Sequence, residues 1–515
     1  MQQTTEDEAT SNAATSLIPA VRDPAPRRDP WAESADPTEE EVGSHRAYRW
    51  PGLAWLVPGL LMGGIGAAGV QRPGLWADEF ATWGMTTVSW SEGLKVLRWV
   101  DAVIGPYYGL MKAWTDAFGN SDVSLRIPSV IAMAFAAALV GAIGNRVYGL
   151  RVGLLAGAIF AVLPGASRFA QEARPYAFTV LGAAVATYAL VRILQGGRFR
   201  WFAAYTAGIA LLGVAHVIAL LLIAAHAWVI LARRRDRWFW FGLAAFIGIL
   251  PAAPLLYLGQ TQKSQVAWIG SFYLTPEAFL ETGFGNAWVA VAIGVMALFA
   301  LALRYPSSIF TAWAVVPLVA LLGLSEYMPL LLPRYLMFTL PAFALLAGTA
   351  LSRPHSLAAI AGVALVAGLA VPVHLEIREV DGHGDATREL ASVITDGYRP
   401  GDAIVYAEGD AFVGSGWLPR DTVAHYVPTA RRPRDVFMIA PPRTDGTLLA
   451  KECPQAACLP EILPPRIWVL RLGYLNDAVQ GVGEEKESLL RTKYREERTW
   501  RPAGFTLALV VRNSS

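Results

Sequence analysis

Two adjacent carboxylates, Asp78 and Glu79, lie among aromatic and small residues directly after the first long apolar segment. Neighbouring side chains point to opposite sides of a strand, and on a helix they diverge by about 100°. We therefore expect the two acids to have different roles. A partly desolvated carboxylate can act as a general base for a hydroxyl group, and its neighbour can orient a substrate or pair with an arginine. The alternative interpretation is a solvated loop.

Arginines beside apolar segments are the second group of candidates. Arg174 lies in the stretch QEARPY, in which Pro175 can open the next helix because its missing N–H costs nothing there. Arg334 follows a proline and precedes another apolar segment. A planar guanidinium matches phosphate oxygens, so both arginines are candidate phosphate ligands; each could equally extend to lipid headgroups. Arg126 is expected to anchor the outer end of the second apolar segment.

The remaining polar candidates have weaker signals. His216 lies at a break between short apolar segments and is interpreted as a satisfied interfacial histidine. Gln262 belongs to a polar run that could line a sugar or headgroup site, although a simple polar loop is the default. Asp101, Tyr107 and Tyr108 lie where aromatic and apolar residues alternate, which favours an amphipathic interfacial helix.

The composition indicates a membrane protein. Of 515 residues, 54% are hydrophobic and only 16% are charged, whereas a soluble protein has about 25% charged residues. The apolar residues gather in runs of about 17 to 22, the length that crosses a bilayer as a helix. A net charge of +2 gives no indication of nucleic-acid binding. The 18 tryptophans and 17 tyrosines fit interfacial belts.

About eleven transmembrane helices are predicted. The apolar segments span 53–70, 127–146, 151–169, 175–194, 202–213, 214–231, 238–258, 286–303, 308–325, 335–351 and 356–373. The stretch 202–231 is long for one helix and short for two, and Gly213 and His216 mark a possible break. If it crosses twice, arginines concentrate in alternate loops, as cytoplasmic loops require. These are Arg146, Arg151, Arg192, Arg198, Arg200, Arg233, Arg234, Arg235, Arg237, Arg304 and Arg353.

This topology places the N-terminus in the cytoplasm and the candidate residues on the outer face. The loops 71–126, 171–175, 259–285 and 326–334 share that face with the C-terminal region. Residues 1–50 have almost no aliphatic side chains and are expected to be a disordered cytoplasmic tail. Residues 51–375 form the predicted transmembrane domain.

Residues 376–515 are predicted to form a small extracytoplasmic α/β domain. Helices are expected over 385–396 and 484–497, and strands over 402–406, 467–470 and 505–511. The region has no Gly-rich phosphate fingerprint and is interpreted as accessory. Cys453 and Cys458 could form a disulfide in an oxidising compartment; without a nearby histidine pair they make a poor zinc site.

Several short motifs occur in the order found in one enzyme class. They are Trp76-Ala77-Asp78-Glu79, Tyr107-Tyr108 with Phe118-Gly119-Asn120-Ser121, Leu125-Arg126-Ile127-Pro128-Ser129, Gln171-Glu172-Ala173-Arg174-Pro175-Tyr176 and Pro333-Arg334-Tyr335. Over residues 53–375 the chain resembles the GT-C membrane glycosyltransferases, in particular bacterial relatives of the dolichyl-phosphate-mannose–protein mannosyltransferases and the lipid A aminoarabinose transferases. It departs from many relatives at 103–106, where a histidine is missing before the paired tyrosines.

The resemblance implies transfer of a sugar, mannose at the family level, from a polyprenyl-phosphate donor on the outer face of the plasma membrane. Asp78 takes the place of the catalytic acid, with Glu79 beside it. The donor-phosphate contacts fall on Arg174 and Arg334, with Arg126 contributing. The supporting residues are Glu172, Tyr107, Tyr108, Tyr176, Tyr335 and Gln262.

The expected acceptor is a hydroxyl group of a protein, glycolipid or polysaccharide, which attacks the anomeric carbon of the sugar with inversion. No cofactor is required, because the leaving group is already a phosphate ester, and a divalent metal is not needed. Two other functions stay open. A transporter or lipid flippase would need ionisable residues near the middles of its spans, whereas here they cluster at outer ends. A non-catalytic scaffold would bind envelope partners through its outer domain.

Overall fold

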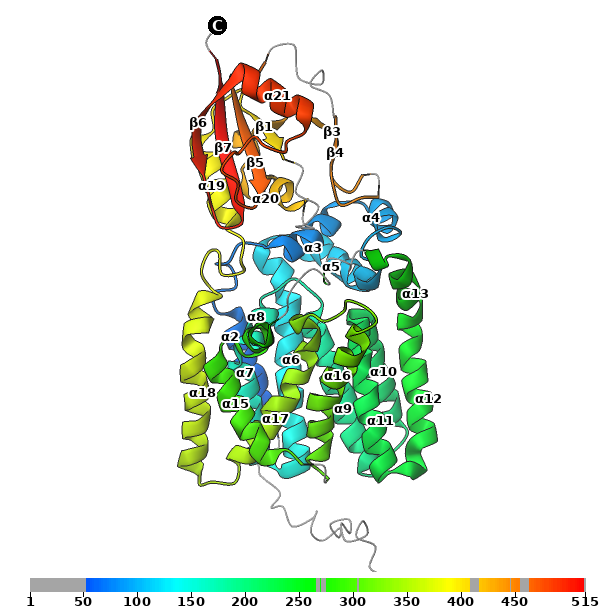
Figure 1. Cartoon of the computed structure of the whole chain (residues 1–515). Helices are drawn as coiled ribbons and strands as arrows, with labels where there is room; N and C mark the ends of the chain where they lie inside the picture. Colours follow the sequence, from blue (N-terminus) through cyan, green and yellow to red (C-terminus); the bar gives the residue numbers. More distant parts are fainter. Residues whose placement is uncertain are drawn as a thin grey trace, which may run out of the picture. The chain divides into compact units, whose positions relative to one another are not determined.

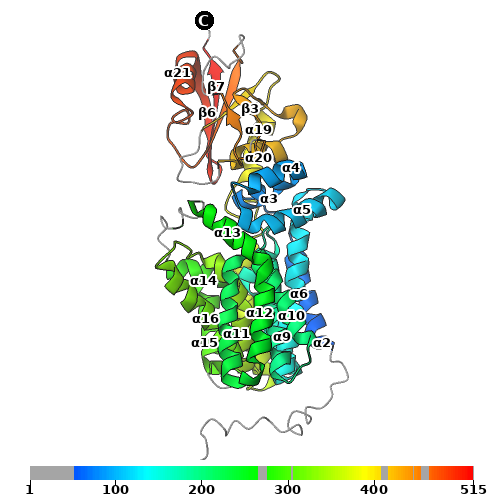
Figure 2. The same ribbon diagram turned by 90° about the vertical axis from the view of Figure 1, so that its right-hand side faces the viewer.

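The computed structural model describes residues 52–264, 269, 275–302, 305–407, 416–444, 446–453 and 463–513. The predicted disordered tail, residues 1–50, lies outside this part of the chain. The described residues form a helical bundle, a layer of short helices at one end of it, and a domain built on a β-sheet (Figures 1 and 2). We call the described residues from 377 to 513 the sheet domain.

The bundle contains the long apolar helices. They are α2 (Leu53–Ala67), α6 (Asp122–Tyr148), α7 (Leu150–Val162), α8 (Pro164–Ala170), α9 (Tyr176–Leu194), α10 (Arg200–Ala215), α11 (Leu222–Arg233), α12 (Trp238–Ile249), α13 (Ala253–Thr261), α14 (Pro276–Phe284), α15 (Ala287–Ala300), α16 (Ser308–Ser325), α17 (Leu340–Leu351) and α18 (Ser356–Glu376). Each predicted apolar segment overlaps at least one of these helices; α7 and α8 share the segment 151–169, and α12 and α13 share the segment 238–258. The polytopic helical membrane fold predicted from the sequence is confirmed.

The number of membrane crossings is less sharply defined. Among the described residues, six helices are long and apolar enough to span a bilayer, or up to eight if each bent helix pair is one span. One of these pairs, α7 and α8, bends by 65° at Pro164, where proline interrupts the helical hydrogen bonds. Three shorter apolar helices cover 53–67, 200–215 and 217–233. The total of about eleven spans stays a prediction.

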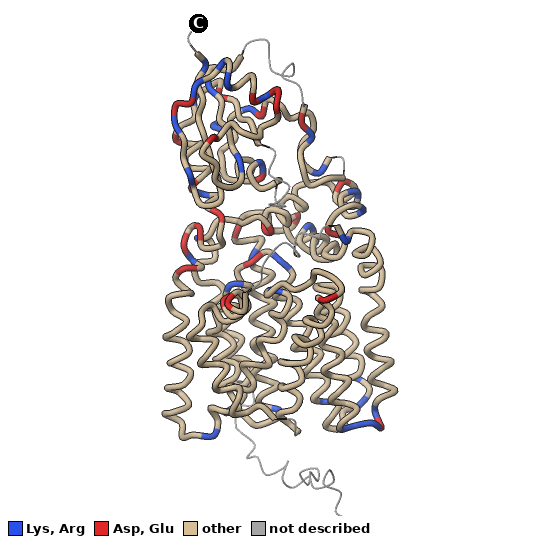
Figure 3. Tube along the Cα trace, in the orientation of Figure 1, with Lys and Arg blue, Asp and Glu red and all other residues tan. Residues whose placement is uncertain are grey.

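The stretch 202–231 is broken where the sequence indicated. Helix α10 ends at Ala215, and the 3-10 helix η2 (Val217–Leu221) precedes α11. The α11–α12 loop and the α17–α18 loop lie at the end of the bundle away from the sheet domain. These are arginine-containing loops, and charged residues are sparse along the bundle between its ends (Figure 3).

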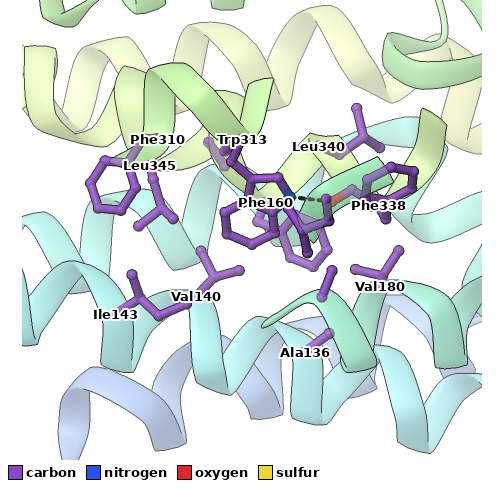
Figure 4. Packing of buried hydrophobic residues seen from close by; sticks show 14 of the residues in the cluster. Ala136, Val140, Ile143, Phe160, Val180, Phe310, Trp313, Phe338, Leu340 and Leu345 are labelled. Atoms are coloured by element: carbon purple, nitrogen blue, oxygen red, sulfur yellow. Dashed lines mark hydrogen bonds between the residues drawn. The ribbon is translucent and has the colours of Figure 1, made fainter. Parts of the chain in front are cut away.

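Close helix packing holds the bundle together. A side chain at Gly141 would meet the Ala54 carbonyl oxygen at 1.9 Å, so α6 can approach α2 only because this residue is glycine. At the centre of the core, the Trp313 indole N–H donates to the Phe338 carbonyl at 2.9 Å, surrounded by Phe160, Leu345 and other buried apolar residues (Figure 4). A buried indole of this size needs such a partner.

Three short helices lie between the bundle and the sheet domain (Figures 1 and 2). They are α3 (Ala77–Thr87), α4 (Trp90–Leu97) and α5 (Gly105–Phe118). The predicted helix around Tyr107 and Tyr108 therefore exists as α5, but both tyrosines are buried in protein. The predicted lipid-surface position for these two side chains is wrong.

The sheet domain has a five-stranded sheet in the order β2-β1-β5-β7-β6. The strands are β1 (Ala403–Tyr406), β2 (Arg434–Asp435), β5 (Arg466–Leu472), β6 (Tyr494–Trp500) and β7 (Phe505–Arg512). Strands β2, β1 and β5 are parallel, and β7 pairs antiparallel with both β5 and β6. A separate two-stranded sheet joins β3 (Met438–Ala440) and β4 (Lys451–Glu452). The helices are α19 (Thr387–Gly397), α20 (Leu418–Tyr426) and α21 (Glu484–Lys493).

One predicted element of this domain is wrong at its end. The charged helix expected over 484–497 stops at Lys493, and the next residues form the edge strand β6. The sequence YREERTW places aromatic residues at both ends of the strand and charged residues between them. Charged side chains are common on edge strands, where they oppose pairing with other chains. Their helical charge pattern concealed the strand.

Candidate active site

Helix α3 carries the two adjacent acids at its N-terminus. Asp78 and Glu79 both lie in the first turn, where the partial positive charge of the helix end stabilises carboxylates. Their side chains diverge as predicted. The Glu79 side chain is fully buried, whereas 22% of the Asp78 side chain is exposed. The two carboxylates therefore have different environments and different partners.

Glu79 is the centre of a buried ion pair. Its two carboxylate oxygens accept hydrogen bonds from Nε and Nη2 of Arg126, at 2.8 and 2.6 Å. The Ala173 backbone N–H donates to Oε1 at 2.9 Å, and Nδ1 of His383 lies 3.3 Å from Oε2. Burial alone would raise the pKa of Glu79, but Arg126 and His383 outweigh it and hold the pKa well below its usual range. Glu79 is a charged structural group that joins three segments.

Arg126 has no donor left for a ligand. Besides Glu79, its Nη1 donates to the carbonyls of Val70 and Pro73, both at 2.9 Å, and its Nη2 donates to the Gly74 carbonyl at 3.1 Å. These bonds engage all five guanidinium N–H groups. The geometry therefore contradicts the prediction that Arg126 contacts the donor phosphate. It agrees with the prediction that Arg126 anchors the outer end of its helix, since it fixes the loop that leads to α3.

Asp78 faces two other arginines. Its Oδ2 lies 3.8 Å from Nε of Arg174 and 3.6 Å from Nη2 of Arg334. Both separations exceed a direct hydrogen bond. Asp78 Oδ2, Arg174 Nε and Arg334 Nε are buried and have no hydrogen-bond partner within the described residues. Buried polar atoms normally have partners, so these three atoms outline a place for oxygen atoms of a ligand or water.

Arg174 is held from behind by a tyrosine and an acid. The Tyr108 hydroxyl donates to Oδ2 of Asp101 at 2.8 Å and accepts from Nη1 of Arg174 at 3.3 Å. Burial raises the pKa of Asp101, although Arg174 and Tyr108 counteract it. Burial also holds the pKa of the Tyr108 phenol well above its usual value, with Asp101 adding to the shift. Tyr108 therefore stays neutral, and its hydroxyl links Asp101 to Arg174 through two hydrogen bonds.

A second carboxylate borders the arginines. Glu172 is buried, and its Oε2 accepts from Nη1 of Arg168 at 2.5 Å, while Oε1 has no partner within the described residues. Burial raises the pKa of Glu172 to about 7, against the attraction of Arg168. The guanidinium groups of Arg168 and Arg334 lie 5.6 and 5.8 Å from the Trp76 ring centre, within the range of cation–π attraction.

Aromatic rings form the wall next to Arg334. The ring of His216 lies 4.5 Å from the ring of Tyr335 and 5.9 Å from that of Tyr176, between centroids. His216 Nδ1 is buried without a hydrogen-bond partner in the described part of the chain. The interpretation of His216 as a satisfied interfacial histidine is therefore wrong. It belongs to the wall of the candidate site, and the chain break beside it brings the ring there.

Gln262 does not face the site. Its Oε1 accepts from the Ala102 backbone N–H at 2.9 Å, and its Nε2 donates to the Leu97 carbonyl at 3.0 Å. The side chain ties the segment 97–102 to the end of α13, and this contradicts the prediction that it lines a ligand site. Within the described residues, no group of three or more His, Cys, Asp or Glu side chains is placed to hold a metal ion.

A family model and solved structures are similar to this chain. Residues 106–258 match the family model described as dolichyl-phosphate-mannose-protein mannosyltransferase. No curated protein matches the chain in sequence. ArnT from Cupriavidus metallidurans, solved bound to undecaprenyl phosphate, superposes with a TM-score of 0.55 at 12% identity, covering 89% of this chain and 98% of that one. The chain has the fold of ArnT. In the apo state ArnT gives a TM-score of 0.52 at 12% identity, covering 87% and 96%.

The predicted resemblance to GT-C membrane glycosyltransferases is thus confirmed. The ArnT-like fold covers both the bundle and the sheet domain, whereas the matching family model covers 106–258 alone. That matched stretch contains Arg126 and Arg174 but neither Asp78 nor Arg334. The structure shows that Asp78 and Arg334 lie close together, because α3 and the start of η6 (Pro333–Thr339) meet at the Asp78 carboxylate.

Most of the predicted site residues come together in the ArnT-like fold. The residues gathered around Asp78 are Arg174, Arg334, Glu172, Tyr108, Tyr176 and Tyr335. Tyr107 is buried beside them, with its ring edge-on to Phe178 at 6.0 Å. Sequence reasoning missed the roles of Asp101 and His383. His383 lies far from the motifs, and Asp101, although close in sequence to Tyr107 and Tyr108, is predicted only as part of an interfacial helix.

Proposed function

We propose that the chain is a membrane glycosyltransferase that moves a sugar from a polyprenyl-phosphate donor to a hydroxyl acceptor. The observation that carries this proposal is that Asp78 Oδ2 lies 3.8 Å from Nε of Arg174 and 3.6 Å from Nη2 of Arg334. Asp78 Oδ2 and the Nε atoms of both arginines have no hydrogen-bond partner within the described residues. The ArnT fold supports it, since ArnT was solved with undecaprenyl phosphate bound. A lipid phosphate and a general base are thereby expected at one place.

In the proposed reaction Asp78 accepts the proton of the acceptor hydroxyl as its oxygen attacks the anomeric carbon. The bond from that carbon to the phosphate oxygen breaks, and the lipid phosphate leaves with the electron pair. Attack opposite the leaving group inverts the configuration. Arg174 and Arg334 stabilise the charge that develops on the phosphate. A positioned base contributes about 10²–10⁴-fold, and the arginines can contribute as much.

Neither a cofactor nor a divalent metal is needed in this scheme, because the leaving group is already a phosphate ester whose charge the arginines balance. Glu79 and Arg126 act as positioning residues for α3 and its preceding loop. Glu172 adjusts the charge near the phosphate. Tyr108 and Asp101 orient Arg174.

We further propose that the site faces the outside of the plasma membrane, with the N-terminus in the cytoplasm. Cys453 is disulfide-bonded, which suits an oxidising compartment; Cys458 lies outside the described residues. The arginine-containing loops at the far end of the bundle fit a cytoplasmic face. Residues 51–375 then form the transferase domain and 376–515 the extracytoplasmic domain, with a protein, glycolipid or polysaccharide as acceptor.

The proposal is tested by sugar transfer in membranes that contain the full chain. The full-length wild type or a variant is expressed in a strain in which the gene is deleted, so that the natural acceptors are present in its membranes. These membranes are supplied with undecaprenyl phosphate carrying labelled mannose, glucose or aminoarabinose. Wild type should transfer one of these sugars. Asp78→Asn should lower transfer by about 10²-fold or more, and Asp116→Asn, an exposed acid paired with Lys112, should not change it.

Kinetics distinguish the proposed base, Asp78, from the proposed phosphate ligand, Arg174. Arg174→Ala should impair the use of the donor more than that of the acceptor, while Arg235→Ala, an arginine in the α11–α12 loop, is the matched control. Full activity of Asp78→Asn would remove Asp78 as the base. A defect of Arg174→Ala confined to the acceptor would refute the phosphate assignment. Failure of wild type to transfer any sugar, with no glycoconjugate changed in the deletion strain, would refute the proposed function.

A further inference from the structure

The backbone groups of Leu75 and Ala77, just before Asp78, are held by side chains of the sheet domain. The Leu75 backbone N–H donates to the Tyr426 hydroxyl at 2.8 Å, and the Leu75 carbonyl accepts from Oγ1 of Thr387 at 2.9 Å. Tyr426 belongs to α20 and Thr387 to α19. Both backbone groups of Leu75, three residues before Asp78, are therefore satisfied by side chains more than 300 positions away in the sequence.

The same arrangement occurs at Ala77, the first residue of α3. Its N–H donates to Oδ2 of Asp385 at 3.2 Å, and its carbonyl accepts from Nε1 of Trp417 at 3.2 Å. The residue before it, Trp76, makes no side-chain cap for the helix. A helix start leaves N–H groups without partners inside the helix. Asp385 accepts one of them, as a local cap residue would.

Apolar packing extends the contact along α3. Phe80 and Trp83 belong to the same buried cluster as Leu418 and Val423 of α20. Farther along the helix, Gly84 has no room for a side chain, since an added Cβ would lie 1.9 Å from Cζ of the buried Arg443. The helix that bears Asp78 is thus also part of the core of the sheet domain.

We infer that Asp385, Thr387, Trp417 and Tyr426 are positioning residues for the Asp78 carboxylate, so that the sheet domain is a working part of the active site. The inference rests on the proposed function in one respect, the role of Asp78 as the base. Asp78 follows Ala77 directly, so any rotation of the backbone at 75–77 moves its carboxylate relative to Arg174 and Arg334. A misplacement of about 1 Å can lower a rate about 10²-fold.

The surroundings of the Asp78 carboxylate explain why the backbone before it needs this support. The two arginines stand 3.8 and 3.6 Å away and form no direct hydrogen bond to the carboxylate. They leave the carboxylate free for a substrate, and they cannot fix its place. On one side of Asp78, the bundle holds Glu79 through Arg126 and the Ala173 backbone N–H. On the other side, the backbone of 75–77 is held by four side chains of the sheet domain.

Two conservative variants remove single bonds of this support. Thr387→Val keeps the shape of the side chain and loses the bond to Leu75, and Trp417→Phe keeps an aromatic ring and loses the bond to Ala77. Each has a matched control in the same domain. Thr395→Val loses an equivalent hydroxyl bond to the Ala391 carbonyl within α19. The control for the indole is Trp468→Phe, which loses a bond to Asp402.

The measured quantities are kcat and KM for transfer of the labelled sugar from undecaprenyl phosphate, per amount of folded full-length protein. Thr387→Val and Trp417→Phe should lower kcat by about 10- to 100-fold and change the donor KM by less than about threefold, because the arginines that bind the phosphate are untouched. The two controls should keep kcat even where they lower the melting temperature. Asp385→Asn, which keeps an acceptor oxygen for Ala77, should retain more activity than Asp385→Ala.

A second measurement does not depend on the substrate. Hydrogen–deuterium exchange of the peptide covering 74–83, in the full chain in lipid nanodiscs, should speed up in Thr387→Val and Trp417→Phe and stay unchanged in both controls. Unchanged exchange in the two variants would overturn the inference whatever the reaction is. Inactive Asp78→Asn together with fully active Thr387→Val and Trp417→Phe would overturn it and leave the proposed function standing. Faster exchange in the two variants, in a chain that transfers no sugar, would overturn the proposed function and leave the sheet-domain support of 75–77 standing.

Discussion

Neutralising Glu79 should destabilise the protein strongly, because it strands a buried charge. Arg126 has no exposed side-chain surface, and Glu79 is its only ionised partner within hydrogen-bond distance in the described part of the chain. Burial lowers the pKa of the neighbouring His383 to about 3, so His383 is neutral and adds no charge. Glu79→Gln keeps the shape of the side chain and removes the charge. Breaking a buried ion pair in this way costs about 3–5 kcal/mol.

Removing both charges together should cost less. In the double variant Glu79→Gln with Arg126→Met, no buried charge lacks a partner, and the remaining cost is the loss of the hydrogen bonds from Arg126 to the 70–74 carbonyls. The assay is unfolding of the purified chain in nanodiscs by denaturant, followed by tryptophan fluorescence. The prediction is a loss of about 3–5 kcal/mol for Glu79→Gln and a smaller loss for the double variant. A loss below about 1 kcal/mol in Glu79→Gln, the size of an exposed pair, would refute the buried-pair interpretation.

The pH dependence gives an independent check with a definite sign. The pKa of Glu79 is lower in the folded chain than the value of 4.5 for a free side chain. The stability from this carboxylate is therefore fully present above about pH 4.5 and is lost as the pH falls towards the folded pKa. The wild type should lose stability steeply below that pH, and Glu79→Gln should lose less. Parallel curves for the two proteins would contradict the low pKa.

Three further predictions follow from neighbouring groups. Because burial raises the pKa of Glu172 to about 7, its deprotonation adds negative charge beside the phosphate site; the donor KM should rise between about pH 6 and 8 in the wild type and stay flat in Glu172→Gln. Asp101→Asn should raise the donor KM about 3- to 10-fold by loosening Arg174, with no change in melting temperature comparable to that of Glu79→Gln; an unchanged KM would contradict this relay. Gly84→Ala should cost about 1–3 kcal/mol, because the Arg443 guanidinium occupies the space of a Cβ; a variant as stable as wild type in denaturant unfolding would show that Arg443 can move.

The local parts of the site could be predicted from the sequence. Apolar runs of membrane-spanning length locate the helices, and a loop after a span brings Asp78 to the membrane surface. Arg174 and Arg334 lie at the starts of two later spans, and the arginine bias of alternate loops puts all three on one face. Each of these steps depends on composition and spacing within a single segment, which a sequence displays directly.

Which acid pairs with which arginine could not be predicted in the same way. Composition and spacing do not separate Glu79, which is neutralised by Arg126, from Asp78, which faces the other two arginines; only the family resemblance assigns the catalytic role to Asp78. Adjacent acids have the same local signal, and the choice of partner depends on which side of α3 meets α6. The resemblance likewise places Arg126 among the phosphate contacts, whereas its position beside an apolar segment predicts an anchor. Its five engaged N–H groups become visible only when the carbonyls of the 70–74 loop are placed around it.

The role of the sheet domain was hidden for a related reason. The side chains that hold the backbone of Leu75 and Ala77 are a threonine, a tyrosine, a tryptophan and an aspartate without any common motif. Backbone N–H and carbonyl groups carry no residue identity, so a sequence cannot show that they need partners from a distant domain. The expectation of an accessory domain came from the absence of a known fingerprint, and absence of a motif says little about support of this kind.

The position of α3 follows from the weakness of short helices. At 11 residues it is below the length of about 12–15 at which an isolated helix becomes stable in water, so it depends on its packing against other elements. Bundle residues secure it through the pair of Glu79 with Arg126, and sheet-domain residues secure its first turn. Asp78, between these two attachments, is left with its carboxylate directed at arginines it does not touch. Changes at Arg174 or Arg334 should therefore alter mainly the binding of an anionic ligand, whereas changes in the sheet-domain side chains that hold 75–77 should alter mainly the turnover of the bound ligand.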